Sequence, residues 1–129
     1  MGGWVLEDVT VYVVDDDDAV RDSLKLLLES YGIAVQAFGS TDEFLRGYRP
    51  NSHACLVLDQ HLPGATGLDF LSSPEGAQLD IPVILVTGRG DPALRARALD
   101  AGVFAYLEKP VDDGAIIAAI EQALADRSC

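Results

Sequence analysis

Short apolar runs alternate with segments of helical periodicity along the chain. Several of these runs are apolar at successive positions, as in strands of a parallel sheet that helices cover on both faces. Regular alternation of strands and helices indicates the same α/β architecture. We therefore expect one domain with a doubly wound, five-stranded parallel sheet in the order 2-1-3-4-5. The predicted strands are Val9–Val14, Ala34–Phe38, Ala54–Asp59, Pro82–Gly88 and Ala105–Glu108.

The segments between the runs carry the signals of helices. Apolar residues recur at helical spacing from Ala19 to Tyr31. Ser40 with Glu43 has the pattern of a capping box, and Asp91 followed by Pro92 is typical of a helix start. A short helix is predicted around Leu68–Ser72, the helix after Asp91 ends at Gly102, and the last helix carries Ile116, Ile117, Ile120 and Leu124 on one face.

Chemically capable side chains stand at the ends of four of the five predicted strands. Ligands of open parallel sheets bind outside the carboxyl ends of the strands, where the strand order reverses. We expect these side chains to converge there, although they come from almost the whole length of the chain. They are Asp15 and Asp16 after the first strand, Asp59 on the third, Thr87 on the fourth and Lys109 after the fifth.

Carboxylates gathered in one crevice need a compensating charge. Two of them about 5 Å apart repel by about 3 kcal/mol at an effective dielectric constant near 20. Oxygen ligands open to water suit Mg²⁺, with Mn²⁺ as the alternative ion. Beside such a cation Asp59 can attack a phosphoryl group, while the Thr87 hydroxyl and the Lys109 ammonium contact the phosphoryl oxygens.

The run of four aspartates divides by role. Asp15 and Asp16 belong to the predicted metal site. Asp17 and Asp18 stand where the first helix begins, and acids there cap free backbone N–H groups and favour the positive end of the helix dipole.

Composition limits the function classes. The chain has 129 residues and a net charge of −12, which argues against direct binding to nucleic acid. It has no apolar run of membrane length and no secretory signal, and its two cysteines form no disulfide framework, so we expect a cytoplasmic protein without a membrane partner. We interpret residues 1–8 as an N-terminal extension, 9–126 as the domain and 127–129 as a tail.

Four sequence stretches together resemble the receiver domain of two-component response regulators, the CheY-like family. They are "VVDDD", "LVLDQHLPGATG", "ILVTG" and "YLEKP", and their wording is closest to the FixJ/NarL type. The resemblance implies that Asp59 accepts a phosphoryl group from a sensor histidine kinase. It also implies that Asp15, Asp16, Asp59 and the backbone carbonyl of His61 hold Mg²⁺, that Lys109 pairs with Asp59 or its phosphate, and that the Lys109–Pro110 bond is cis.

The same resemblance implies a switch rather than a metabolic enzyme, although the domain assists its own phosphorylation and dephosphorylation. Thr87 would move toward the phosphoryl group and Tyr106 would turn inward, although Tyr106 as ordinary core is the alternative. The output surface would consist of the fourth helix, the fifth strand and the fifth helix. This surface would contact an output domain or downstream protein that acts in transcriptional control. It would also allow two copies of the domain to form a homodimer on phosphorylation. His61 and Arg89 would set the lifetime of the acyl phosphate, unless both are plain loop residues.

Two alternatives remain open at this point. A phosphatase of the haloacid-dehalogenase type would use Asp15 as nucleophile with Asp17, and then Thr87, Lys109, Asp112 and Asp113. Against it, Ala19 stands where Thr or Val is expected and Asp59 has no role. The other alternative is a receiver fold that acts as an interaction module without phosphorylation.

Overall fold

Five parallel strands form a single sheet in the order β2-β1-β3-β4-β5, which confirms the predicted fold. The computed structural model describes residues 9–50 and 53–128. Asp59 at the end of β3 pairs with Val86, and Thr87 at the end of β4 pairs with Glu108, so the carboxyl ends of these strands lie together. The strands are β1 (Thr10–Val14), β2 (Ala34–Phe38), β3 (Ala54–Asp59), β4 (Val83–Thr87) and β5 (Ala105–Glu108).

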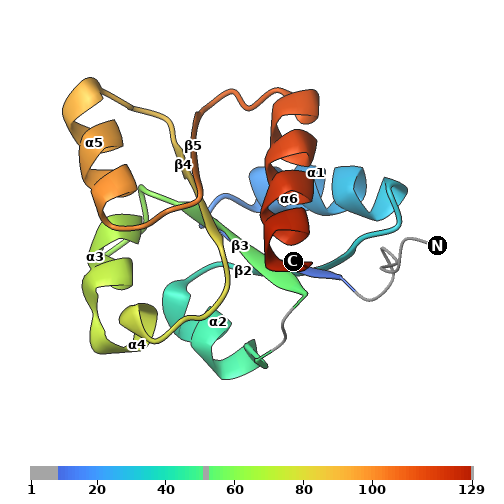
Figure 1. Ribbon diagram of the computed structural model, residues 1–129, viewed down its shortest axis with the longest axis horizontal. Helices are drawn as coiled ribbons and strands as arrows, with labels where there is room; N and C mark the ends of the chain where they lie inside the picture. Colours follow the sequence, from blue (N-terminus) through green and yellow to red (C-terminus); the bar gives the residue numbers. More distant parts are fainter. Residues whose placement is uncertain (1–8, 51–52, 129) are drawn as a thin grey trace.

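Helices cover both faces of the sheet (Figure 1). The helices α1 and α6 lie on one face, while α2, α3 and α5 lie on the other. The bounds are α1 (Asp18–Ser30), α2 (Thr41–Gly47), α3 (Gly67–Ser72), α4 (Pro74–Ala77), α5 (Pro92–Asp100) and α6 (Asp113–Ser128). No helix in the described part of the chain is both long and apolar enough to cross a bilayer.

The core divides into two apolar clusters, one on each face of the sheet. Successive residues of β1 and β3 belong to alternate clusters: Val13 packs toward α1 and α6, and Val14 toward α2 and α3. Because side chains alternate between faces along a strand, burial of both faces requires runs that are apolar at every position. Cys55 is one of these buried residues, and desolvation raises the pKa of its thiol to about 12. Cys55 therefore serves as a small apolar residue of the core.

The start of α1 confirms the predicted helix-start role of Asp17 and Asp18. The Asp17 carboxylate accepts hydrogen bonds from the backbone N–H groups of Ala19 and Val20, at 2.9 and 3.3 Å, as an N-cap. Asp18 lies in the first turn and forms an ion pair with Arg21.

Two local predictions need correction. Ser40 caps α2, but the Glu43 carboxylate accepts from the Gly39 N–H at 3.3 Å instead of closing a capping box with Ser40. A complete box occurs at the start of α3 between Thr66 and Asp69, where no box was predicted. The helix α4 was also missed, since its four residues are too few for a periodic pattern. The predicted extension at residues 1–8 and Cys129 lie outside the described residues.

Candidate functional site

Three carboxylates meet at the carboxyl ends of β1 and β3. One oxygen each of Asp15, Asp16 and Asp59 lies within 4.8 Å of the others. Asp15 and Asp59 are buried, whereas Asp16 is exposed. A set of carboxylate oxygens with one open side fits a hard divalent cation such as Mg²⁺, which keeps several of its waters.

Lys109 lies between two of these acids. Its Nζ is 3.0 Å from Asp15 Oδ2 and 3.5 Å from Asp59 Oδ1. Burial acts to lower the pKa of Lys109, but the hydrogen bond and charge of Asp15, followed by Asp59, outweigh it, so the pKa is raised. The ammonium is therefore held in its charged form. The cis Lys109–Pro110 bond is present as predicted.

The surroundings of Asp59 disfavour the charged form of its carboxylate, so its pKa is raised. Desolvation raises its pKa most, and the negative charge of Asp15 raises it further. Lys109 and the His61 backbone N–H, which lies 3.3 Å from Asp59 Oδ1, oppose this shift only in part. The repulsion expected from the sequence is thus present, and a bound cation would relieve it.

This shift makes a prediction about stability and pH. A raised pKa means that the native state holds the Asp59 proton more tightly than the unfolded chain, so the associated stability is present at acid pH and is lost as pH rises. We expect Asp59→Asn to raise the free energy of unfolding at pH 7 in EDTA by on the order of 1 kcal/mol, a fraction of the bare repulsion between two carboxylates. The gain should shrink as pH falls through the raised pKa of Asp59 and should be nearly gone at about pH 4, the ordinary pKa of an aspartate. Urea unfolding over a pH series measures it.

Added Mg²⁺ supplies the control for that measurement. The ion should stabilise the wild-type protein, because it binds the native state, and should stabilise the Asp59→Asn variant less. A variant less stable than wild type at pH 7 in EDTA would contradict the assignment of strain to Asp59.

Thr87 is fully buried, and its hydroxyl contacts the loop after β3. Thr87 Oγ1 lies 2.8 Å from Nε2 of His61 and accepts a hydrogen bond from the Arg89 N–H at 3.1 Å. Sequence reasoning placed Thr87, His61 and Arg89 near one another but missed the contact between the imidazole and the hydroxyl. The available signal was the position of His61, two residues after Asp59, on a loop that follows the strand beside β4.

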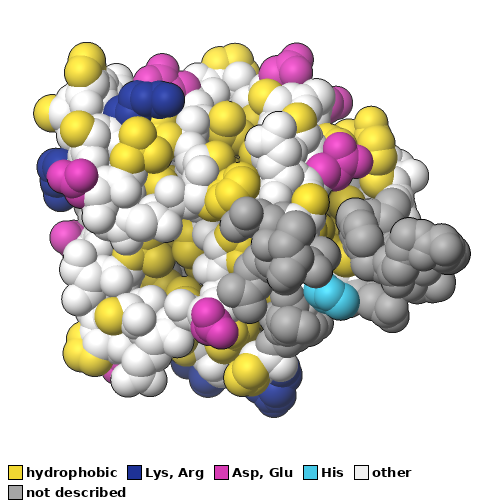
Figure 2. Space-filling view, viewed as in Figure 1, with side chains coloured by type: hydrophobic (Ala, Val, Ile, Leu, Met, Phe, Trp, Pro, Cys, Tyr) yellow, Lys and Arg dark blue, Asp and Glu magenta, His cyan; other side chains and the backbone are white. Residues whose placement is uncertain are grey.

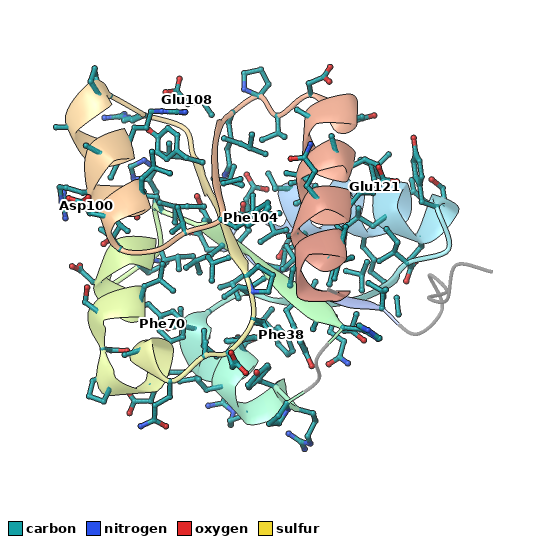
Figure 3. The ribbon with its side chains drawn as sticks, in the orientation of Figure 1. Phe38, Phe70, Asp100, Phe104, Glu108 and Glu121 are labelled. Atoms are coloured by element: carbon teal, nitrogen blue, oxygen red, sulfur yellow. The ribbon has the colours of Figure 1, made fainter. Side chains whose placement is uncertain are left out.

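Tyr106 is buried on β5, with 8% of its surface exposed. The Arg95 guanidinium lies 5.6 Å from the centre of its ring. Within the described part of the chain its hydroxyl oxygen has no well-formed hydrogen bond. Burial, then the charge of Glu108, raises its pKa against the lowering effect of the Asp91 backbone N–H. Glu108 stands at the carboxyl end of the same strand (Figure 3). The ring approaches Gly90 so closely that a Cβ there would collide with the Tyr106 hydroxyl and the Glu108 carboxylate.

Gln60 and Gly67 hold the loop that carries the site, a role that the sequence did not indicate. The Gln60 side chain is buried and accepts from the Leu68 N–H at 3.0 Å. Its backbone carbonyl accepts from the Gly67 N–H at 3.0 Å. A neutral buried amide leaves no charge or periodicity signal in a sequence, so only the fold reveals this role.

A cavity of about 290 Å³ opens beside the acids, between α1 and the connection from β5 to α6. Asp15, Asp59 and Lys109 form its polar wall, and mostly apolar residues line the remainder. On the face that Figure 2 shows, acidic side chains lie scattered rather than gathered. The acids of the site are brought together by the ends of β1 and β3.

Comparison with known proteins decides the family. The response regulator receiver domain family matches residues 11–121. The chain belongs to this family. A transcriptional regulatory protein FixJ from Azorhizobium caulinodans is 44% identical over 118 residues, covering 92% of this chain and 56% of FixJ. The receiver domain thus spans about half the length of that relative.

Solved structures of receiver domains superpose on this one. A low-resolution structure of the response regulator StyR has a TM-score of 0.82 at 39% identity, covering 92% of this chain and 60% of that chain. The beryllofluoride-activated receiver domain dimer of NtrC4 has a TM-score of 0.82 at 26% identity, covering 92% of this chain and 98% of that chain.

Two acids that the phosphatase alternative needs for its chemistry serve helix starts in the structure. That alternative needs Asp17 and Asp112 for chemistry. In the structure Asp17 caps α1, and the Asp112 carboxylate accepts from the Ala115 N–H at 3.1 Å, in the first turn of α6. Both acids therefore serve helix starts, whereas Asp59 stands in the acidic cluster.

Proposed function

We propose that this receiver domain accepts a phosphoryl group on Asp59 from the phosphohistidine of a sensor histidine kinase. The observation that carries the proposal is the placement of the buried Asp59 carboxylate beside Lys109, in one cluster with Asp15 and Asp16. A carboxylate oxygen of Asp59 attacks phosphorus, the P–N bond to the donor imidazole breaks, and its electron pair returns to that ring.

The side chains around Asp59 favour this transfer. Asp15, Asp16, Asp59 and the backbone carbonyl of His61 would hold Mg²⁺, or Mn²⁺ in its place. The metal would neutralise negative charge on the transferring group. Lys109 is already placed to move from Asp15 onto a phosphoryl oxygen, which makes the site a stabiliser of the new charge.

The switch in this proposal couples Thr87 and Tyr106 to an output surface. The predicted fourth and fifth helices are α5 and α6 of the structure, so this surface consists of α5, β5 and α6. It carries the exposed Leu99 on α5 and the exposed Phe104 directly before β5. Because the relative FixJ is longer than this chain, we propose an output domain or downstream protein as partner, in transcriptional control. The NtrC4 neighbour is a receiver dimer, which supports a phosphorylation-dependent homodimer here. We place the protein in the cytoplasm.

The lifetime of the acyl phosphate belongs to the same proposal. His61 and Arg89 are exposed, and both contact Thr87, His61 through its ring and Arg89 through its backbone N–H. We propose that their side chains control the approach of the attacking water. The domain would thereby influence its own dephosphorylation without being a metabolic enzyme.

Intact mass after incubation with acetyl phosphate and Mg²⁺ tests the proposal. We expect one added phosphoryl group, absent without metal and absent in Asp59→Asn. Asp100→Asn, an exposed acid at the end of α5, is the matched control and should be phosphorylated like wild type. If the phosphorylated form is too short-lived for mass measurement, binding of beryllofluoride, which mimics the phosphoryl group without hydrolysing, tests the same site. If neither reagent modifies or binds the wild-type protein at Asp59, the proposal fails and the non-phosphorylated interaction module remains.

A further inference from the structure

We propose that His61 is a positioning residue that holds the Thr87 hydroxyl in the unphosphorylated protein and must release it when Asp59 is phosphorylated. This inference rests on the proposed function of Asp59. It concerns the side chain of His61, whereas the metal site would use only its backbone carbonyl.

The other hydrogen bond of Thr87 shows which group donates in the contact between Thr87 and His61. The Arg89 N–H can only donate, so it occupies a lone pair of Thr87 Oγ1 and leaves the hydroxyl proton without an acceptor. Thr87 is fully buried, and an unpaired buried hydroxyl proton is costly. Among the hydrogen bonds of the described residues, the acceptor within reach is His61 Nε2 at 2.8 Å. Thr87 therefore donates to the imidazole, whose Nε2 carries no proton.

The same residue touches the phosphoacceptor and the switch. The His61 backbone N–H lies 3.3 Å from Asp59 Oδ1, while its ring holds Thr87. Since β3 and β4 are neighbours and Asp59 pairs with Val86, Thr87 lies next to the strand end that would carry the phosphoryl group.

A hydroxyl has one proton and cannot donate it to two acceptors in different directions. When a phosphoryl oxygen takes the Thr87 proton, the bond to His61 has to break. The His61 side chain is exposed, so its ring can turn to water once it is released. Phosphorylation therefore works against this bond, and His61 biases the domain toward its resting state.

Beryllofluoride affinity in saturating Mg²⁺ measures the effect. We expect His61→Ala to bind beryllofluoride about two- to tenfold more tightly than wild type, as follows from the net strength of one neutral hydrogen bond. His61→Gln, whose amide oxygen can replace Nε2 as acceptor, should return toward the wild-type affinity. With Thr87→Ser, which keeps the hydroxyl, His61→Ala should still tighten binding. With Thr87→Ala it should change nothing.

A second measurement needs no phosphoryl mimic. Nitrogen-15 chemical shifts of the His61 ring in the neutral form should show the proton on Nδ1, and Thr87→Ala should remove that preference. A proton on Nε2 would overturn the inference, because Thr87 would then be the acceptor.

The outcomes separate this inference from the proposed function. If wild type binds beryllofluoride and Asp59→Asn does not, but His61→Ala leaves the affinity unchanged or weakens it, His61 does not restrain Thr87. A tightening that persists in Thr87→Ala would likewise overturn the inference. If wild type fails to bind beryllofluoride at Asp59, the proposed function itself fails, and the restraint with it.

Discussion

Replacing Lys109 with methionine is expected to slow phosphorylation of Asp59 by acetyl phosphate about 100-fold or more. Removal of one positioned group that stabilises charge in a transition state costs roughly 10²–10³ in rate. The ammonium of Lys109 lies 3.0 Å from Asp15 and 3.5 Å from Asp59, whereas methionine retains a similar length without the charge. The loss also removes an attraction that lowers the Asp59 pKa, so a larger fraction of Asp59 carries a proton and is unable to attack. The rate of mass gain at saturating Mg²⁺ gives the measurement.

Lys25→Met is the matched control for that variant. Lys25 lies on α1, about half exposed, and pairs with Glu29 at 3.4 Å, away from the acidic cluster. Its loss should leave the rate unchanged, since exposed pairs contribute little. If a folded Lys109→Met variant is phosphorylated within threefold of the wild-type rate, Lys109 does not stabilise the transfer to Asp59.

Gly67→Ala is expected to destabilise the fold by about 2–3 kcal/mol, at the upper end of the effects of overpacking. A Cβ at this position would lie 2.8 Å from the backbone oxygen of Asp59 and 2.9 Å from Leu85 Cδ1. The Asp59 oxygen belongs to the end of β3 and has little room to retreat, because β3 pairs with strands on both sides. Urea unfolding monitored by circular dichroism measures the change.

Gly88→Ala controls for the general effect of adding a methyl group to a glycine. A Cβ on Gly88 meets no atom within 4 Å, and the residue is exposed. Its free energy of unfolding should therefore stay within about 0.5 kcal/mol of wild type. Equal effects of the two substitutions would show that the close approach of α3 to β3 does not limit stability.

Much of the site could be predicted because its residues stand at strand ends. A run such as Ala54–Asp59 is apolar at almost every position, which specifies a buried parallel strand, and its terminal acid then has one place to lie. The five-stranded order brings Asp15 and Lys109 within 3.0 Å although they are 94 positions apart. The sheet therefore brings the site residues together, and the apolar runs of the sequence predict the strands of that sheet.

The choice of partners within the site could not be predicted in this way. The resemblance paired Lys109 with Asp59, but the ammonium lies closer to Asp15, because distances of a few tenths of an ångström depend on how the whole loop after β5 packs. The bond between Thr87 and His61 likewise depends on the path of the β3–α3 loop, which Gln60 and Gly67 hold from within.

The sequence by itself determined the strands and the helix starts at Asp17 and Asp91, since these depend on local periodicity and capping. With the strand order common to doubly wound sheets, it also indicated the end of the sheet where the acids meet. Only the tertiary structure decided which acid holds Lys109, which side chain holds Thr87 and how Gly90 makes room for Tyr106. These contacts join residues from different strands and loops, and their geometry is set by packing, which no single stretch of sequence encodes.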